Sequence, residues 1–155
     1  MNPAKLKFGY THSMDNLKVG SIIFNHKKTG LRFKVAVTPT SIQSRNKVMI
    51  DKVRVEVGRV ASDEFCKEFM ANIKDKPLSV TLYFFLTKAD IDTKDVDNLA
   101  KLTVDALQGH LFDNDKQIYR LECHKILVDS KYWRWIGVQV NRHKEIPFKQ
   151  INCRP

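Results

Sequence analysis

Short runs in which apolar and polar residues alternate predict where the strands of this chain lie. Residues 31–37, LRFKVAV, alternate and are rich in branched side chains, and residues 78–86, LSVTLYFFL, are dense in branched and aromatic residues. Both patterns are typical of β-strands. Residues 118–128 and 132–140 predict two further strands, joined by a short turn at residues 129–131.

Helix-forming residues fill the long window between the first two predicted strands. Residues 41–76 contain many Lys, Glu, Ala and Met and few turn residues, so we interpret them as helical. Residues 53–57 alternate like a strand, which leaves a second interpretation open there. Gly58 and Ser62 could divide the helix into two, and Pro77 ends it.

The remaining segments complete a mixed arrangement of helices and strands. Residues 87–94 predict a polar loop, and residues 95–108 predict a helix that Gly109 ends. The order of elements, strand, helix, strand, helix, strand, strand, predicts a mixed α/β (α+β) fold. We expect a single domain in which helices pack on a mixed β-sheet.

The two ends of the chain are harder to interpret than its middle. Residues 1–30 are polar apart from the apolar run at residues 22–24, and they could form an extension or an extra hairpin. We therefore expect an N-terminal extension over residues 1–30, a folded domain over residues 31–141 and a tail over residues 142–155.

Composition narrows the class of protein. The chain has 155 residues, of which 43% are hydrophobic, and this is enough for one core. It has no apolar stretch of membrane-spanning length and no signal-peptide pattern at its start, so we expect a cytoplasmic protein without a membrane partner. Three scattered cysteines, Cys66, Cys123 and Cys153, form no C-x-x-C pair and are expected to be reduced thiols.

Charge changes this picture. Lys and Arg number 27 and Asp and Glu number 17, which gives a net charge of +10. A surface of this kind attracts polyanions such as nucleic acids. Basic proteins are common, so charge alone decides little, and the position of the acidic residues carries more information.

Acidic residues gather in and after the predicted helix 95–108. On a helical wheel its apolar residues fill a broad arc, and Asp97, Asn98, Lys101 and Asp105 fall together on the remaining side. Asp95 precedes them at the helix start, and Asp115 follows in the next loop. Because a carboxylate near a helix N-terminus is favoured by the helix dipole, simple capping is one explanation.

The second explanation is a site for a hard metal ion. Mg²⁺ takes oxygen ligands, usually one or two carboxylates completed by water and substrate phosphate, and Asp95, Asp97 and Asp115 could supply them. Bunched carboxylates repel one another, which a bound cation relieves. Lys101 could pair with Asp97 or stabilise charge that develops on a phosphate. His110 and His124 have no H-x-x-x-H spacing, which disfavours a zinc hydrolase.

These residues resemble the core signature of RusA-type Holliday-junction resolvases. The run DVDNLAKLTVDAL at residues 95–107 is followed by a glycine and then by the D-x-Q of residues 115–117, and each position of the signature is filled. The upstream pattern P-x-S-x-Q-S at residues 39–44 is similar to the N-terminal part of many phage-type members. The resemblance covers about residues 31–140. It departs from the family where Asn114 replaces the first of two adjacent acids, and in both termini.

The resemblance implies a homodimeric, mixed α/β nuclease that needs Mg²⁺, with Mn²⁺ as an expected substitute, and that nicks four-way DNA junctions in a bacterial or phage-infected cell. By its implication Asp95, Asp97 and Asp115 hold the metal and Lys101 assists catalysis. Asn98, Asp105 and Gln117 are expected to support these residues. The expected DNA contacts, chosen as basic residues near the acids, are Arg45, Lys47, Lys52, Arg54, Lys88 and Lys94.

We therefore expect a structure-selective endodeoxyribonuclease. One alternative is a DNA-binding protein without activity that keeps a relict acidic cluster, and a lesser one is a metal-dependent nucleotide phosphohydrolase. We expect steep salt dependence of DNA binding. A homodimer would offer two sites to a two-fold symmetric substrate. Its interface could use Tyr132, Trp133 and Trp135 of the predicted strand 132–140, although the two tryptophans could equally belong to the core.

Overall fold

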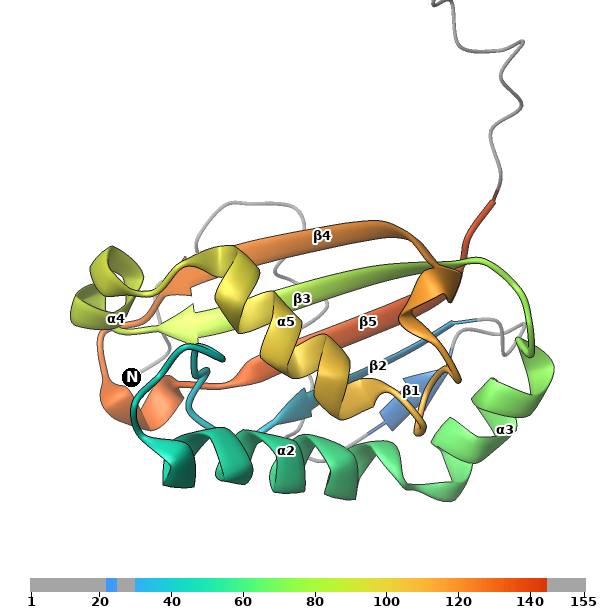
Figure 1. Ribbon diagram of the computed structural model, residues 1–155, viewed down its shortest axis with the longest axis horizontal. Helices are drawn as coiled ribbons and strands as arrows, with labels where there is room; N and C mark the ends of the chain where they lie inside the picture. Colours follow the sequence, from blue (N-terminus) through green and yellow to red (C-terminus); the bar gives the residue numbers. More distant parts are fainter. Residues whose placement is uncertain (1–21, 25–29, 145–155) are drawn as a thin grey trace, which may run out of the picture.

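The computed structural model describes residues 22–24 and 30–144. They form a five-stranded sheet with α-helices on one face (Figure 1). In chain order the elements are β1 (Ile22–Phe24), β2 (Gly30–Val35), α2 (Lys47–Ala61), α3 (Glu64–Asn72), β3 (Leu78–Leu86), α4 (Lys88–Thr93), α5 (Val96–Leu107), the 3-10 turn η1 (Asp115–Gln117), β4 (Ile118–Leu127), the 3-10 turn η2 (Lys131–Trp133) and β5 (Ile136–Arg142). The predicted mixed α/β fold is confirmed.

The strand order is β1-β2-β5-β3-β4. β3 and β4 run parallel, and the other neighbouring pairs are antiparallel. Parallel neighbours need a crossover connection, and here α4 and α5 provide it. The predicted strands 118–128 and 132–140 are consecutive in the chain but do not pair with each other, because β3 lies between β4 and β5.

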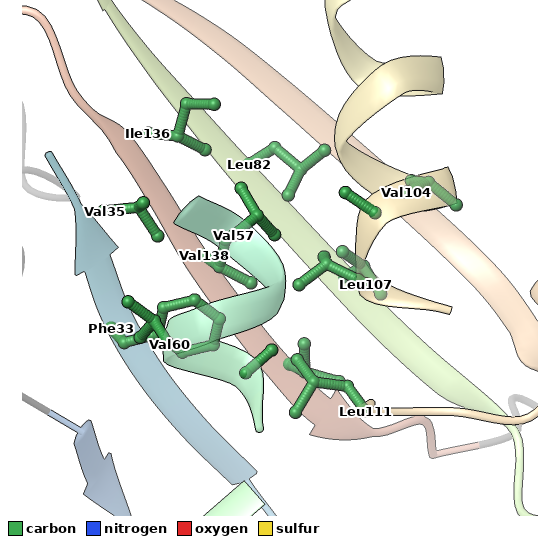
Figure 2. Close-up of a cluster of buried hydrophobic side chains, with 14 of the residues drawn as sticks. Phe33, Val35, Val57, Val60, Leu82, Val104, Leu107, Leu111, Ile136 and Val138 are labelled. Carbon is green, nitrogen blue, oxygen red and sulfur yellow. The ribbon is translucent and has the colours of Figure 1, made fainter. Parts of the chain in front are cut away.

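The hydrophobic core lies between the sheet and helices α2 and α5. Figure 2 shows side chains from these helices meeting those of β2, β3 and β5. Residues at helical spacing on α2 face the sheet, as expected for a half-buried helix, and every second residue of the strands meets them. The labelled members of this cluster are Phe33, Val35, Val57, Val60, Leu82, Val104, Leu107, Leu111, Ile136 and Val138.

The helix expected over residues 41–76 divides into two helices, and of the two candidate positions the division falls at Ser62 and not at Gly58. Ser62 follows α2, and the Asp63 carboxylate starts α3 by accepting a hydrogen bond from the Phe65 N–H at 2.9 Å. Gly58 lies inside α2. A Cβ at Gly58 would come within 3.3 Å of His110 Nε2, so this glycine permits a close approach between α2 and the turn after α5.

Two other predictions of local structure were wrong. Residues 87–94 are not a loop, because α4 occupies residues 88–93 and the Thr87 hydroxyl donates to the Asp90 carboxylate at 3.3 Å. The last strand begins at Ile136 and not at Tyr132, since residues 131–133 form η2. Trp133 and Trp135 therefore precede the strand, and the alternation of strand side chains does not determine where their rings point. Their rings pack edge to face, with 5.4 Å between the ring centroids.

Two of the three cysteines can be placed. Cys66 is buried and Cys123 is half-buried, and both are free thiols. Burial raises the pKa of Cys66 to about 12, which keeps this thiol protonated and unreactive. Cys153 lies outside the described residues. Among the described helices, none combines the length and the apolar character that crossing a membrane requires.

Candidate active site

Helix α5 presents the acidic residues. The side chains predicted to be apolar are buried against the sheet, whereas Asp97, Lys101 and Asp105 are exposed. The predicted division of this helix into a buried and an exposed face is therefore confirmed. The helix begins at one end of the sheet, beside α4 and the loop that leads into α2 (Figure 1).

Asp95 occupies the N-cap position of α5, but its side chain makes no capping hydrogen bond. A capping carboxylate normally accepts a hydrogen bond from the second or third backbone N–H of the helix. Capping therefore does not use the Asp95 carboxylate, which is left available for another partner.

Asp97, Asp105 and Asp115 line one hollow of about 410 Å³, together with Lys101. We name it the acidic hollow. Its other wall is apolar and comes from α5 and the outer strand β4. The apolar lining residues are Val96, Ala100, Val104, Leu121 and Cys123. Among the lining residues, three negative formal charges thus face one positive charge.

A hydrogen-bonded turn holds Asp115 at this hollow. Gln117 Oε1 accepts from the backbone N–H groups of Asp113 at 3.1 Å and Asn114 at 3.4 Å, and Gln117 Nε2 donates to the Lys76 carbonyl at 3.3 Å. The Asn114 side chain accepts from the Lys116 N–H at 2.9 Å. These hydrogen bonds fix the turn that carries Asp115. Gln117 therefore positions Asp115, although it does not line the hollow itself.

Lys101 pairs with Asp105, at 3.7 Å between Nζ and Oδ2, and not with Asp97. The pair is exposed, with 65% of the Lys101 side chain accessible. An exposed pair of this length is weak, so the ammonium can leave Asp105 for a substrate phosphate.

Asp95 faces a different hollow on the other side of the α5 start, with a volume of about 440 Å³. We name it the polar hollow. It shares no lining residue with the acidic hollow, and half of its lining residues come from the loop between β2 and α2. Its lining residues are Thr38, Thr40, Ser41, Gln43, Ser44, Asn46, Met49, Thr93, Lys94, Asp95, Asn98 and Arg134.

Two cations of the polar hollow are held by one carboxylate. Lys94 Nζ and Arg134 Nη1 each lie 3.2 Å from an oxygen of Asp90. Burial alone would raise the pKa of Asp90, but the two cations bring the pKa below its ordinary value. Sequence reasoning missed Arg134, because it lies 44 residues from Asp90 in the chain and no local motif marks it.

The six predicted DNA contacts differ in how free they are. Arg45, Lys47 and Lys52 are exposed and form no ion pair with another described residue, whereas Arg54 pairs with Asp51 and Lys88 with Asp92. Lys94 is only 21% exposed and also donates to the Pro39 carbonyl at 2.7 Å. Two of its three N–H donors are thus already used.

The structure brings two of the three predicted metal ligands to one hollow and leaves the third outside it. Within residues 22–24 and 30–144, no three Asp, Glu, His or Cys side chains come together as a metal-binding group. Asp97 and Asp115 share the acidic hollow, whereas Asp95, two residues before Asp97, lines the polar hollow. The chemistry of the lining suits a hard cation, because every lining side chain that carries oxygen is an aspartate.

The two histidines weighed from the sequence, His110 and His124, lie apart from both hollows. His110 packs over Gly58. His124 stacks on Tyr83 at 5.2 Å between ring centroids, and strand alternation places both rings on the sheet face opposite α5. Neither residue lines either hollow.

Comparison with known proteins adds one match that bears on this site. A family model described as endodeoxyribonuclease RusA matches residues 54–137, which is more than half of the chain and includes all the predicted metal ligands. No curated protein matches. One similar solved structure is a Salmonella typhimurium protein provisionally described as a translation initiation inhibitor. It is 10% identical, with 79% of this chain and 98% of that chain covered and a TM-score of 0.29, too low to bear on fold or function.

Proposed function

The chain belongs to the RusA endodeoxyribonuclease family, and from that premise we propose that it is a Mg²⁺-dependent endonuclease that nicks four-way DNA junctions. The observation that carries the proposal is the acidic hollow, where Asp97, Asp105 and Asp115 face one space in a chain of net charge +10. A cluster of carboxylates on a basic protein suits a metal that meets a phosphate there.

Asp97 and Asp115 would hold the metal in the acidic hollow, with Asp95 as the third ligand. Two features of the structure support this assignment. The Asp95 carboxylate is not used for capping, and Asp115 stands on a turn that Gln117 fixes. When bound, Mg²⁺ would neutralise the phosphate and favour the ionised form of a bound water. Mn²⁺ also prefers oxygen ligands and is expected to substitute.

The side chains around the metal ligands have separate tasks. Lys101 would exchange its exposed pairing with Asp105 for a bond to the scissile phosphate, where it would stabilise developing negative charge. Asn98 borders the polar hollow, and its backbone carbonyl accepts from the Ile42 N–H at 3.2 Å. This bond ties the loop before α2 to the helix that carries the ligands.

We also propose that the protein acts as a homodimer, because paired nicks in a four-way junction need two sites related by two-fold symmetry. Among the described strands, β4 pairs only with β3 and forms one edge of the sheet. Tyr119, Leu121 and Leu127 of β4 are 63%, 46% and 49% exposed. An apolar edge strand is a common docking surface. Sedimentation at micromolar concentration tests the dimer, and a monomer both free and on junction DNA would contradict it.

A nicking assay tests the proposed activity. The purified chain is mixed with a labelled four-way junction and with a linear duplex of the same length, in Mg²⁺, in Mn²⁺ and in EDTA. We expect symmetric nicks in the junction with either metal and none in EDTA, and little cutting of the duplex. Tight junction binding without nicks in any metal would instead favour a binding protein, and turnover of free nucleotides would favour a phosphohydrolase.

A further inference from the structure

The polar hollow has the chemistry of an anion site, although it lies beside a cluster of acids. Hydroxyl and amide side chains dominate its lining, and its formal charges are two positive, from Lys94 and Arg134, and one negative, from Asp95. The loop that forms half of the wall contains the P-x-S-x-Q-S pattern of residues 39–44, which the proposed metal chemistry does not use.

Arg134 keeps hydrogen-bond donors for a ligand after its contacts in the protein are counted. Its Nε donates to the Lys131 carbonyl at 3.2 Å and its Nη1 to Asp90 at 3.2 Å. A guanidinium has five N–H donors, so three remain. Asp90 balances one of the two cations it holds, and Asp95 balances the other in formal charge, so an anion would be bound by the remaining hydrogen-bond donors and not by an excess of positive charge.

The loop from residue 38 to residue 46 is fixed in a form that leaves its hydroxyls able to donate. The hydroxyl oxygens of Ser41 and Ser44 accept from the backbone N–H groups of Gln43 and Asn46, both at 3.2 Å. An accepting hydroxyl still has its O–H for another partner. The loop is held by Lys94 at the Pro39 carbonyl and by the bond between Ile42 and Asn98.

The start of α5 forms the boundary between the two hollows, and its first backbone N–H groups receive no bond from the Asp95 side chain. Free amides at the start of a helix of 12 residues favour anions. They add to Arg134, Lys94 and the serine hydroxyls as donors that suit phosphate oxygens.

We infer that the polar hollow binds a backbone phosphodiester of the same DNA strand that enters the acidic hollow, through Arg134, Lys94 and the loop of residues 41–46. The inference rests on the proposed function, since it names the site that holds the strand beside the point of cutting. It adds Arg134 and Gln43 to the DNA-binding residues, and it makes Asp90 a positioning residue for both cations.

A charge series at Gln43 tests the inference without disturbing the fold. Gln43 is exposed, and its backbone N–H, but not its side-chain amide, forms a hydrogen bond with another described residue. The variants Gln43→Glu, Gln43→Ala and Gln43→Lys are compared by their Kd for a four-way junction in EDTA at several salt concentrations. Gln108→Glu is the matched control, because it makes the same change at the exposed far end of α5 and lines neither hollow. Arg134→Gln is measured in parallel.

We expect Gln43→Glu to weaken binding by about threefold or more and Gln43→Lys to strengthen it, because one charge is added beside a phosphate. Arg134→Gln should weaken binding by about tenfold and reduce the slope of log Kd against log salt by about 0.9. A Gln43 series that matches Gln108→Glu would overturn the inference, even if Arg134→Gln lowers affinity by loosening the fold.

The nicking assay separates this inference from the proposed function. A graded Gln43 series in a protein that never cuts DNA would support the polar hollow as a phosphate site and contradict the proposed nuclease activity. Normal nicking with a flat Gln43 series would do the reverse. Absence of DNA binding by the wild-type chain would contradict both.

Discussion

The acidic hollow and the polar hollow lie on opposite sides of the same helix start, yet their chemistry is opposite. The first is lined by three carboxylates and one ammonium against an apolar wall. The second is lined by hydroxyls, amides, two cations and the carboxylate of Asp95. Asp95 and Asp97 are only two residues apart, and the turn of α5 sends them to different sides. A phosphate would be repelled by the first hollow in the absence of a cation and attracted by the second.

This contrast suggests a division of labour in a nuclease. A strand that crosses the start of α5 would be held on one side and cut on the other, and Asp95 would connect the two. Substitutions on each side should then separate binding from cleavage, and the predictions that follow probe the two sides in turn.

The largest effect is expected from the metal ligands. Asp115→Asn and Asp95→Asn should each lower the single-turnover rate of junction cleavage by at least about 100-fold, or roughly 2.7 kcal/mol, because each removes an oxygen ligand. Junction affinity in EDTA should be unchanged or higher, since negative charge near the phosphates is lost. If Asp95→Asn cuts normally while Asp115→Asn does not, Asp95 belongs to the polar hollow alone.

Lys101 should give the next largest effect. Lys101→Met should lower the cleavage rate at saturating enzyme by about 10- to 100-fold, the range for a group that stabilises transition-state charge. The melting temperature should hardly change, because the pair with Asp105 is exposed. Asp105→Asn is the matched control, since it removes the same pair and leaves the ammonium. Equal losses of rate in the two variants would mean that the pair matters and not the Lys101 charge.

Gln117 tests whether the acidic hollow needs its fixed loop. Gln117→Ala removes three hydrogen bonds and should weaken Mn²⁺ binding by about tenfold, as is common for groups that orient metal ligands. Mn²⁺ titration followed by electron paramagnetic resonance measures this effect without DNA. Gln117→Glu keeps the two acceptor interactions and should recover part of the affinity. Unchanged Mn²⁺ affinity in Gln117→Ala would remove the positioning role.

The last of these predictions concerns stability and not catalysis, and it is made for Asp90, on the polar side. Its folded-state pKa is lowered by Lys94 and Arg134, so its contribution to stability is present above the ordinary Asp value and is lost as pH falls through the lowered value. Asp90→Asn should cost about 1–3 kcal/mol at pH 7. The difference from the wild type should shrink as pH falls below the ordinary Asp value and through the lowered one, because both proteins then carry a neutral residue there. Urea unfolding of both proteins at pH 7 and at a pH below the ordinary Asp value measures the difference in free energy of unfolding. A difference that is the same at the two pH values would contradict this prediction.

Local patterns were sufficient for the buried elements. Residues 78–86 are almost all apolar and form β3 as predicted, and the wheel of residues 95–108 gave the buried face of α5. In α5 burial repeats at helical spacing, and β3 is recognised by its density of apolar residues, since its last five residues are all buried.

Patterns failed where contacts distant in the chain decide the structure. Residues 87–94 looked like a loop because none of the residues of α4 is fully buried. Asp90 of α4 pairs with Arg134, which lies 44 residues later in the chain. Gly58 looked like a helix break because the sequence does not reveal His110 packing over it. The loop before β5 carries aromatic residues that mimic a strand, and η2 delays the strand to Ile136.

The candidate site was predictable in its members but not in its layout. The acids of residues 95–115 are local in sequence, so the wheel could gather Asp97 and Asp105. The separation of Asp95 into the polar hollow depends on the loop of residues 38–46, which lies about 50 residues earlier in the chain. Arg134 joins the site only through the tertiary fold.

If the carboxylates of the acidic hollow hold the metal, the single-turnover cleavage rate of a four-way junction in Mg²⁺ should differ between Asp97→Asn and Asp113→Asn. Both variants remove one carboxylate from an exposed position near α5, but only Asp97 lines the acidic hollow. The account predicts a loss of at least about 100-fold for Asp97→Asn and a rate close to wild type for Asp113→Asn. Equal rates for the two variants would contradict it.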